Sequence, residues 1–165
     1  MPTMVGDICG FVLLDTNNDD KGDTPLNGVL ITLFDDDHKK IASIKTGEDY
    51  LKDGQFCFKG LIAGTYKIVE TNPDDTFNVS DSDGGDPDTI TVVIGGGKPF
   101  DSLDNEFVDE PARTISGTIK EDVDEDGKGD RGVPGVKVLL FAEGNDKHPI
   151  AETTTDKHGN FVFDG

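Results

Sequence analysis

The stretch ICGFVLLDTNNDDKGDTPLNGVLITLF, from Ile8 to Phe34, occurs a second time as ISGTIKEDVDEDGKGDRGVPGVKVLLF, from Ile115 to Phe141. The two copies align without a gap at an offset of 107 residues, the difference between Gly117 and Gly10. An internal repeat defines the domain unit before any fold is assigned, and this period is close to the usual size of one domain. The sequence therefore predicts two copies of one module.

The repeat continues to the end of the printed sequence. The segment GQFCFKG at 54–60 matches GNFVFDG at 159–165, and the second copy has no counterpart of residues 61–108. We expect a complete module over residues 5–109 and the N-terminal part of a second, incomplete module over 114–165. The chain is interpreted as a fragment of a longer tandem array, and a shortened last repeat is the alternative.

The composition is strongly acidic and limits the partners. Asp and Glu number 34 against 15 Lys and Arg, which gives a formal net charge of −19. This excess argues against nucleic acid and anionic membranes and favours cations. No apolar run reaches the length that spans a membrane. Halophile-type acidity is an alternative, whereas disorder fits poorly because apolar residues alternate as in strands.

Short apolar runs separated by Gly, Asp, Asn and Pro are typical of an all-β sandwich. We expect an immunoglobulin-like or prealbumin-like sandwich of seven antiparallel strands, in tandem, with the second copy truncated. The strands of the first module are predicted near residues 6–14, 28–35, 41–46, 55–59, 65–71, 89–94 and 103–108.

Seven antiparallel strands would bring three loops to one end of the module. These loops follow the first, third and fifth strands and comprise residues 15–27, 47–54 and 72–88. Two of them are the most acidic in the module. A full strand at 76–80 would invalidate this count.

The first module carries an apolar patch on its outer face. Alternation along a strand places Cys9, Phe11 and Leu13 on the side opposite Ile8 and Val12. The second copy is polar at the three outward positions, with Ser116, Thr118 and Lys120. A four-residue insertion near 47–53 carries Tyr50 and Leu51, and we expect these two side chains to fold over the patch.

Cys9 and Cys57 are the two cysteines of the chain. Each is the outward member of its strand, so the two side chains are predicted to lie close together or to form a disulfide, which an oxidising compartment would favour. The alternative is two small apolar residues beneath the insertion. No CxxC or Cys/His cluster indicates zinc or redox chemistry.

Both copies contain an acidic loop with the spacing of a calcium site. Calcium takes six to eight oxygen ligands, and alternate side chains of a tight Asp-x-Asn/Asp-x-Asp loop can supply them together with a backbone carbonyl. The predicted ligands in the first loop are Asp15, Asn17, Asp19, the carbonyl of Lys21, and Asp23. Those in the second loop are Asp122, Asp124, Asp126, the carbonyl of Lys128, and Asp130.

The loops depart from an EF-hand at the twelfth position. Leu26 and Val133 stand where an EF-hand has its bidentate Glu, so a remote carboxylate or water must complete the shell. Glu70 and the Asp74–Asp75 pair are candidates in the first module. A solvated acidic turn is the alternative for a single loop, and duplication of the spacing favours calcium. The run at 81–88, SDGGDP between two Asp residues, is either a further calcium site or an ordinary loop.

Three stretches carry a resemblance to a known family: DTNNDDKGDTPLNGV, GQFCFKGLIAGTYKIVETNP and SDSDGGDPDTITV. They resemble the calcium-binding SdrD B-like repeats, which are related to the Cna-B collagen-adhesin repeats. The resemblance implies an immunoglobulin-like sandwich in secreted or surface-attached repetitive proteins, where such modules act as calcium-rigidified spacers or adhesive stalks. It also implies a calcium role for the acidic residues of both loops. The family's Glu after the fourth acid is absent here.

The sequence contains no Gly-x-Ser-x-Gly or His-Glu-x-x-His motif, and we expect no enzymatic activity. We expect a calcium-rigidified spacer or stalk of an extracellular, secreted or cell-surface adhesin-like protein. Its partners would be calcium ions and neighbouring repeat modules, with a protein or glycan ligand left open. A carbohydrate- or protein-binding module appended to a larger extracellular enzyme is the alternative, although the chain has no Trp and only two Tyr.

Overall fold

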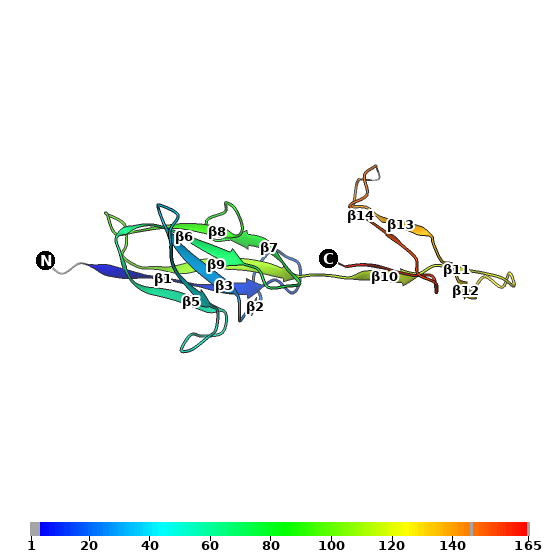
Figure 1. Cartoon of the computed structure of the whole chain (residues 1–165), viewed down its shortest axis with the longest axis horizontal. Helices are drawn as coiled ribbons and strands as arrows, with labels where there is room; N and C mark the ends of the chain where they lie inside the picture. Colours follow the sequence, from blue (N-terminus) through cyan, green and yellow to red (C-terminus); the bar gives the residue numbers. More distant parts are fainter. Residues whose placement is uncertain (1–3, 146, 165) are drawn as a thin grey trace. The chain divides into compact units, whose positions relative to one another are not determined.

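The computed structural model describes residues 4–145 and 147–164, and in this part of the chain every regular element is a strand (Figure 1). The chain divides into two compact units, Met1–Pro111 and Ala112–Gly165. The described residues include no helix that could cross a membrane.

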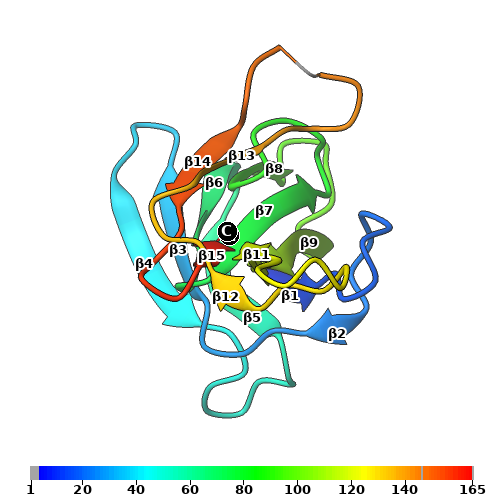
Figure 2. The same cartoon turned by 90° about the vertical axis from the view of Figure 1, so that its right-hand side faces the viewer.

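The first unit is a sandwich of two sheets, which Figure 2 shows nearly end-on. One sheet contains β1 (Val5–Leu14), β2 (Thr24–Pro25), β5 (Gln55–Ile62), β7 (Thr76–Asp81) and β9 (Ser102–Pro111). Its order is β2-β1-β9-β7, and β5 also pairs with β1. The other sheet has the order β4-β3-β6-β8, formed by β3 (Leu30–Asp35), β4 (Lys40–Lys45), β6 (Gly64–Thr71) and β8 (Thr89–Ile94).

Alternating inward side chains of both sheets form the core of the first unit. On β1, Ile8 and Val12 are fully buried, whereas Phe11 and Leu13 are only partly buried, as the predicted alternation requires. The fully buried members opposite and around them include Val29, Ile31, Leu33, Phe56, Ile68 and Phe107. This burial is the main favourable free-energy term that holds the two sheets together.

The all-β sandwich is confirmed, and its strand count and pairing differ from the prediction in two respects. β7 and the two-residue β2 are additional strands, and β1 and β9 pair in parallel, with Val12 opposite Phe107. The parity argument therefore fails, yet the three loops do gather at one end. After β7 the chain returns to that end, where the Glu70 N–H donates to the Asp88 carbonyl. β7 escaped the prediction because Asn, Ser and Asp occupy half of its positions.

The second unit contains counterparts of the first five strands, and two of its six strands, β10 (Ile115–Thr118) and β11 (Lys120–Glu121), together correspond to β1. The others are β12 (Arg131–Gly132), β13 (Lys137–Leu140), β14 (Ala151–Thr154) and β15 (Asn160–Phe163). The six strands form three two-stranded ladders, β10-β15, β11-β12 and β13-β14. The registers repeat those of the first unit: Gly117 lies opposite Phe161 as Gly10 lies opposite Phe56.

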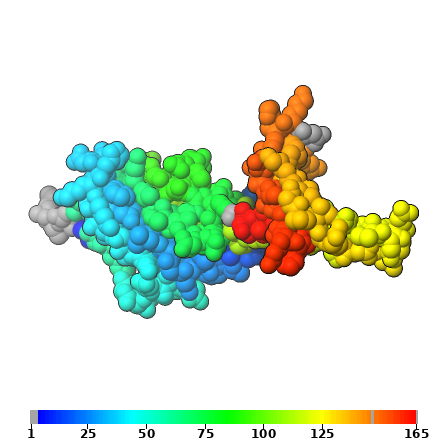
Figure 3. Space-filling view, turned by 45° about the vertical axis from the view of Figure 1, so that its right-hand side comes forward, coloured from blue at the N-terminus to red at the C-terminus, as the bar shows by residue number. Residues whose placement is uncertain are grey.

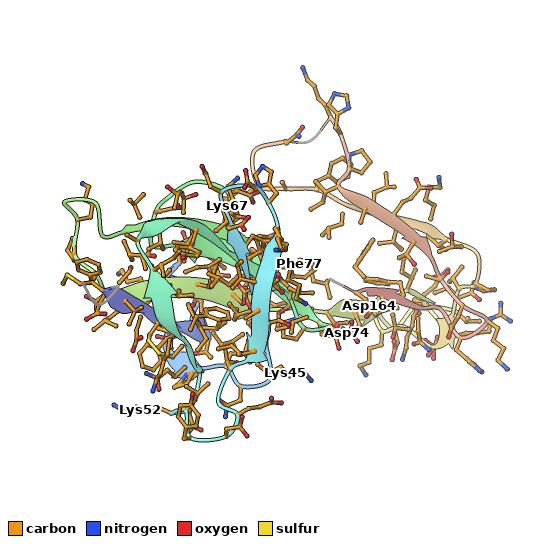
Figure 4. All side chains as sticks on the ribbon, turned by 60° about the vertical axis from the view of Figure 1, so that its left-hand side comes forward. Lys45, Lys52, Lys67, Asp74, Phe77 and Asp164 are labelled. Carbon is orange, nitrogen blue, oxygen red and sulfur yellow. A yellow bond between two sulfur atoms is a disulfide. The ribbon has the colours of Figure 1, made fainter. Side chains whose placement is uncertain are left out.

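Cys9 and Cys57 form a disulfide between directly opposed residues of β1 and β5, so the predicted pairing is confirmed. The expectation for the insertion is wrong for Tyr50, which is 74% exposed and lies under the Lys59 ammonium group. Leu51 is partly buried and lines a small pocket with Cys57. Lys59 is exposed on β5, and the attraction between its ammonium group and the Tyr50 ring holds that ring on the solvent side of the strand. Figure 4 shows Lys52 of the same insertion directed away from the sheets.

Candidate metal site

The first acidic loop is built around the carboxylate of Asp15. The backbone N–H groups of Asn17, Asn18 and Asp19 donate to Asp15 Oδ1 over 3.1, 2.7 and 3.4 Å, and the Asp20 N–H donates to Oδ2 over 2.8 Å. The loop closes where the Thr16 N–H and hydroxyl both donate to Asp23 Oδ2. Short polar side chains of this kind stabilise tight turns by bonding nearby backbone groups.

The second loop repeats two of these hydrogen bonds, whereas its Asp126 N–H donates to Asp124 Oδ1 and not to Asp122. The Gly127 N–H donates to Asp122 Oδ2 over 2.8 Å, and the Val123 N–H donates to Asp130 Oδ2 over 2.8 Å. Both loops also have two left-handed residues at the same places, with φ of 66° and 62° at Asn18 and Asp20 and of 63° and 83° at Glu125 and Gly127. The repeated sequence therefore encodes a repeated loop conformation.

Three carboxylates converge in the second loop. One oxygen each from Asp122, Asp124 and Asp130 lie within 4.8 Å of one another, and all three residues are exposed. The loop projects from the rest of its unit as the yellow segment in Figure 3. Oxygen atoms gathered in this way suit a hard cation such as calcium.

The first loop differs because an amide replaces one carboxylate. Asn17 Nδ2 donates to Asp23 Oδ1 over 3.0 Å, so the amide nitrogen faces the position where a ligand oxygen would be needed. The amide must rotate for its oxygen to bind a cation. Asp19 and Asp126 accept the N–H groups of Lys21 and Lys128 at 3.2 and 2.9 Å, and weak exposed ion pairs join the same side chains.

The first loop favours the charged form of Asp15 and Asp23. Desolvation acts to raise the pKa of Asp15, but the four backbone N–H donors outweigh it, and the pKa is lowered. The Thr16 hydroxyl and N–H lower the pKa of Asp23 in the same way. Ionised carboxylates at neutral pH are what cation binding requires.

Of the remote carboxylates, Glu70 is buried near this loop and the Asp74–Asp75 pair is exposed in the turn that Figure 4 marks at Asp74. Glu70 is connected to the loop through Asp109, a residue that the sequence reasoning missed. The Asp15 N–H donates to the Asp109 carbonyl over 2.6 Å, and Asp109 is fully buried. The sequence did contain a signal for this pair, because Glu70 and Asp109 both lie at the ends of strands, at positions where the alternation predicts an inward-facing side chain.

The 81–88 run uses much of its acid within its own turn. Asp81 Oδ1 accepts the N–H groups of Asp83 and Gly84, and Asp83 Oδ2 accepts that of Thr91 over 2.8 Å. Asp81 Oδ2 and Asp88 Oδ1 are both buried without a hydrogen-bond partner in the described structure. The hydrogen bonds of the turn therefore leave one oxygen of each of these two residues without a partner.

The fold and the loops define an immunoglobulin-like β-sandwich repeat with an acidic loop after its first strand. The family model described as SdrD B-like domain matches residues 4–93. The chain belongs to this family.

Two curated relatives match more than nine tenths of the chain. Serine-aspartate repeat-containing protein C of Staphylococcus aureus (strain Newman) is 34% identical over 93% of this chain and 17% of its own length. Protein D of the same strain is 30% identical over 94% of this chain and 12% of its own length. The chain therefore spans less than a fifth of these relatives.

Among solved structures, the Bacillus anthracis TIE protein matches with a TM-score of 0.52 and 19% identity, over 96% of this chain and 26% of that chain. At this identity the likeness concerns the fold alone, and it agrees with the all-β sandwich described above.

Proposed function

We propose that the chain is a calcium-rigidified spacer or stalk segment of a secreted or cell-surface repetitive protein. The observation that carries the proposal is the duplicated acidic loop, whose hydrogen bonds and left-handed residues recur in both units. Random acidic turns have no reason to share one conformation at the same position of two repeats. Membership of the SdrD B-like family supports the same role.

Each loop would bind one calcium ion through its side-chain oxygens and one backbone carbonyl. In the first loop the ligands would be Asp15, Asn17, Asp19, Asp23 and the Lys21 carbonyl, and in the second Asp122, Asp124, Asp126, Asp130 and the Lys128 carbonyl. Because the loop joins β1 to β2 and leads into β3, a bound ion would fix the connection between the two sheets. A chain of such modules would then resist bending at each module.

The proposed role is structural rather than catalytic, and it places the chain outside the cell. The Cys9–Cys57 disulfide supports this location, because structural disulfides persist in oxidising compartments. The internal repeat of the chain supports a role for neighbouring repeat modules as its partners.

Isothermal titration of the metal-free chain with calcium tests the loop assignment. Asp23→Asn and Asp130→Asn each remove one charged ligand from one loop, and each variant should lose one binding event while the other loop continues to bind. Asp36→Asn, in an exposed turn of the first unit, is the matched control. Titrations of the wild type and both loop variants that are identical would reject the assignment.

A further inference from the structure

The strand β4 is a free edge of the four-stranded sheet in the first unit. In the described chain it pairs with β3 alone, and Figure 2 shows it at the outer margin of the sandwich. The Thr46 N–H donates to the Val29 carbonyl, and backbone groups alternate sides along a strand, so those of Ser43 and Lys45 are directed away from β3. Among the described residues these groups have no backbone partner. The edge is therefore open to a further strand.

The segment that contains β4 is basic within a strongly acidic chain. Residues 38–69 carry six lysines against three acidic residues, whereas the whole chain has 34 acidic and 15 basic residues. Lys40 and Lys45, at the two ends of β4, are exposed, and neither has an ion-pair partner in the described part of the chain. Figure 4 labels Lys45 at the end of this strand. Positive charge without a partner attracts a negatively charged one.

The outer face beside this edge combines lysines with apolar side chains. Phe34 of β3 lies between Lys40 of β4 and Lys67 of β6, and Leu30 lies beside Lys45. Both apolar residues are partly buried. None of the outward side chains of β3, β4 and β6 is acidic. Such a face suits a partner that carries carboxylates next to apolar side chains, which a polypeptide does and a simple anionic polymer does not.

The inner side of the edge is apolar and partly open. Ala42 and Ile44 pack against the core of the first unit but are only partly buried. Side chains of a strand alternate between the two faces of its sheet. A strand added at β4 would therefore place every second side chain beside Ala42 and Ile44, and the others beside the lysines.

A pocket lies at the same edge and can receive one of the inward side chains. Its volume is about 180 Å³, and Ile44, Leu51 and Cys57 form its apolar part. Glu48 and Asp49 also line it, so a neutral side chain fits there better than an acidic one. Sites that bind a peptide by strand addition combine free backbone groups, which give affinity, with pockets for alternate side chains, which give specificity.

We propose that the free edge of β4 binds an extended acidic segment of another protein as a fifth strand of the sheet. Its carboxylates would face Lys40 and Lys45, and neutral apolar side chains would alternate with them and face inward. Opposite charges and apolar pairs across neighbouring strands stabilise such a pairing. A second copy of β4 is unsuitable, because antiparallel pairing would set its lysines against these lysines. This inference does not depend on calcium binding.

The second unit contains the counterpart of this edge without its positive charge. Glu152 of β14 occupies the position of Ser43, and Thr154 occupies that of Lys45. Glu152 also accepts a hydrogen bond from Lys137 Nζ over 3.0 Å, so the lysine beside this edge is already paired. A Glu residue opposite an acidic strand would repel it. We therefore expect the first unit to bind the segment and the second unit not to bind it.

NMR titration of the intact chain with a synthetic peptide of alternating glutamate and valine tests the proposal, and a peptide of alternating lysine and valine is the control. The glutamate peptide should slow hydrogen exchange of the Ser43 and Lys45 amides and leave those of β14 unchanged. Lys45→Glu should weaken its binding about tenfold. Lys98→Glu makes the same change of charge at an exposed position beyond β8, at the other edge of the sheet, and should leave the affinity unchanged.

Ser43→Pro removes an outward N–H group without removing a hydrogen bond to β3, and proline is tolerated at such an edge position. This variant should keep its melting temperature and lose the peptide. Three results would overturn the proposal: no binding of the glutamate peptide, equal binding by Lys45→Glu, or equal binding of the lysine peptide. Binding that leaves the Ser43 and Lys45 amides unprotected would also overturn it, because it would indicate a general anion-binding surface in place of strand addition.

Discussion

At the residue scale, the structure separates acidic side chains that are held in the charged form from those that are not. Asp15 and Asp23 have lowered pKa values because backbone and hydroxyl donors surround them. Glu70 and Asp109 have raised pKa values because burial removes water from their carboxyl groups and nearby carboxylates add negative charge. The two groups lie at the same end of the first unit. The groups with lowered pKa values lose their contribution to stability as pH falls, and those with raised pKa values lose it as pH rises.

The raised pKa values predict that the metal-free protein becomes less stable as pH rises. The folded state retains a proton on Glu70 up to about pH 9, while the unfolded state releases it near the ordinary value of 4.5. Stability from this group is therefore fully present below the unfolded pKa and is lost as pH rises through the folded pKa. Urea unfolding in chelator between about pH 6 and about pH 9 should show this decline, and Glu70→Gln should reduce it. An equally steep decline in the variant would contradict the assignment to Glu70.

A second residue-scale prediction concerns Thr46, which is fully buried. Its hydroxyl donates to the Leu26 carbonyl over 2.6 Å and accepts the Val29 N–H over 3.1 Å. Thr155 makes the same two bonds in the second unit, to Val133 and Val136. Thr46→Val keeps the shape but leaves two buried backbone groups short of a partner, so the free energy of unfolding of the first unit should fall by about 1–3 kcal/mol.

Urea unfolding of Thr46→Val measures this loss, and Thr91→Val, at an exposed position of β8, is the control. A variant as stable as the wild type would show that the hydroxyl is not needed to close the β2–β3 connection.

At the scale of elements, the sequence predicted what local pattern determines. The inward and outward alternation of β1 and the proximity of Cys9 and Cys57 follow from local spacing, which left open whether the two cysteines are bonded. The parallel pairing of β1 with β9 and the burial of Glu70 and Asp109 could not be derived in this way. Both depend on contacts between residues far apart in the chain, such as Asp15 with Asp109, which no local pattern specifies.

The disulfide is the element-scale feature that should contribute most to stability. Cys9 and Cys57 are separated by 48 residues, and a cross-link of that length limits the unfolded chain strongly. Its reduction should lower the free energy of unfolding of the first unit by about 2–4 kcal/mol and leave the second unit unchanged. Urea unfolding with and without reductant measures the effect. Overlapping curves, with thiol alkylation confirming full reduction, would show that the β1–β5 pairing does not depend on the cross-link.

At the scale of the whole molecule, the two units differ in how completely they bury the same residues. Val12, Val29, Ile31, Leu33 and Phe56 are fully buried in the first unit. The counterparts of these residues in the second unit are only partly buried: Ile119, Val136, Val138, Leu140 and Phe161. Among the described inward-facing apolar residues of that unit, Phe163 is the one that is buried, at 8% exposed. Less apolar burial means less stabilisation of the second unit in this chain.

Hydrogen exchange on the 165-residue chain should therefore show faster exchange in residues 115–163 than in the strands of the first unit. The most informative amides are those of Val136 and Thr155, which occupy the same hydrogen bonds as Val29 and Thr46. Sedimentation should first establish that the sample is monomeric. Protection of the second unit as strong as that of the first would show that its six short strands suffice for a stable fold.

Thermal unfolding of the metal-free chain in calcium and in chelator tests the central claim most directly. At calcium ten times above the dissociation constant, linkage stabilises the folded state by about 1.4 kcal/mol for each site. For a unit of this size that corresponds to a rise in melting temperature of about 5–10 °C, with a smaller rise in magnesium. Melting curves that coincide in calcium and in chelator would contradict the account of this chain as a calcium-rigidified module.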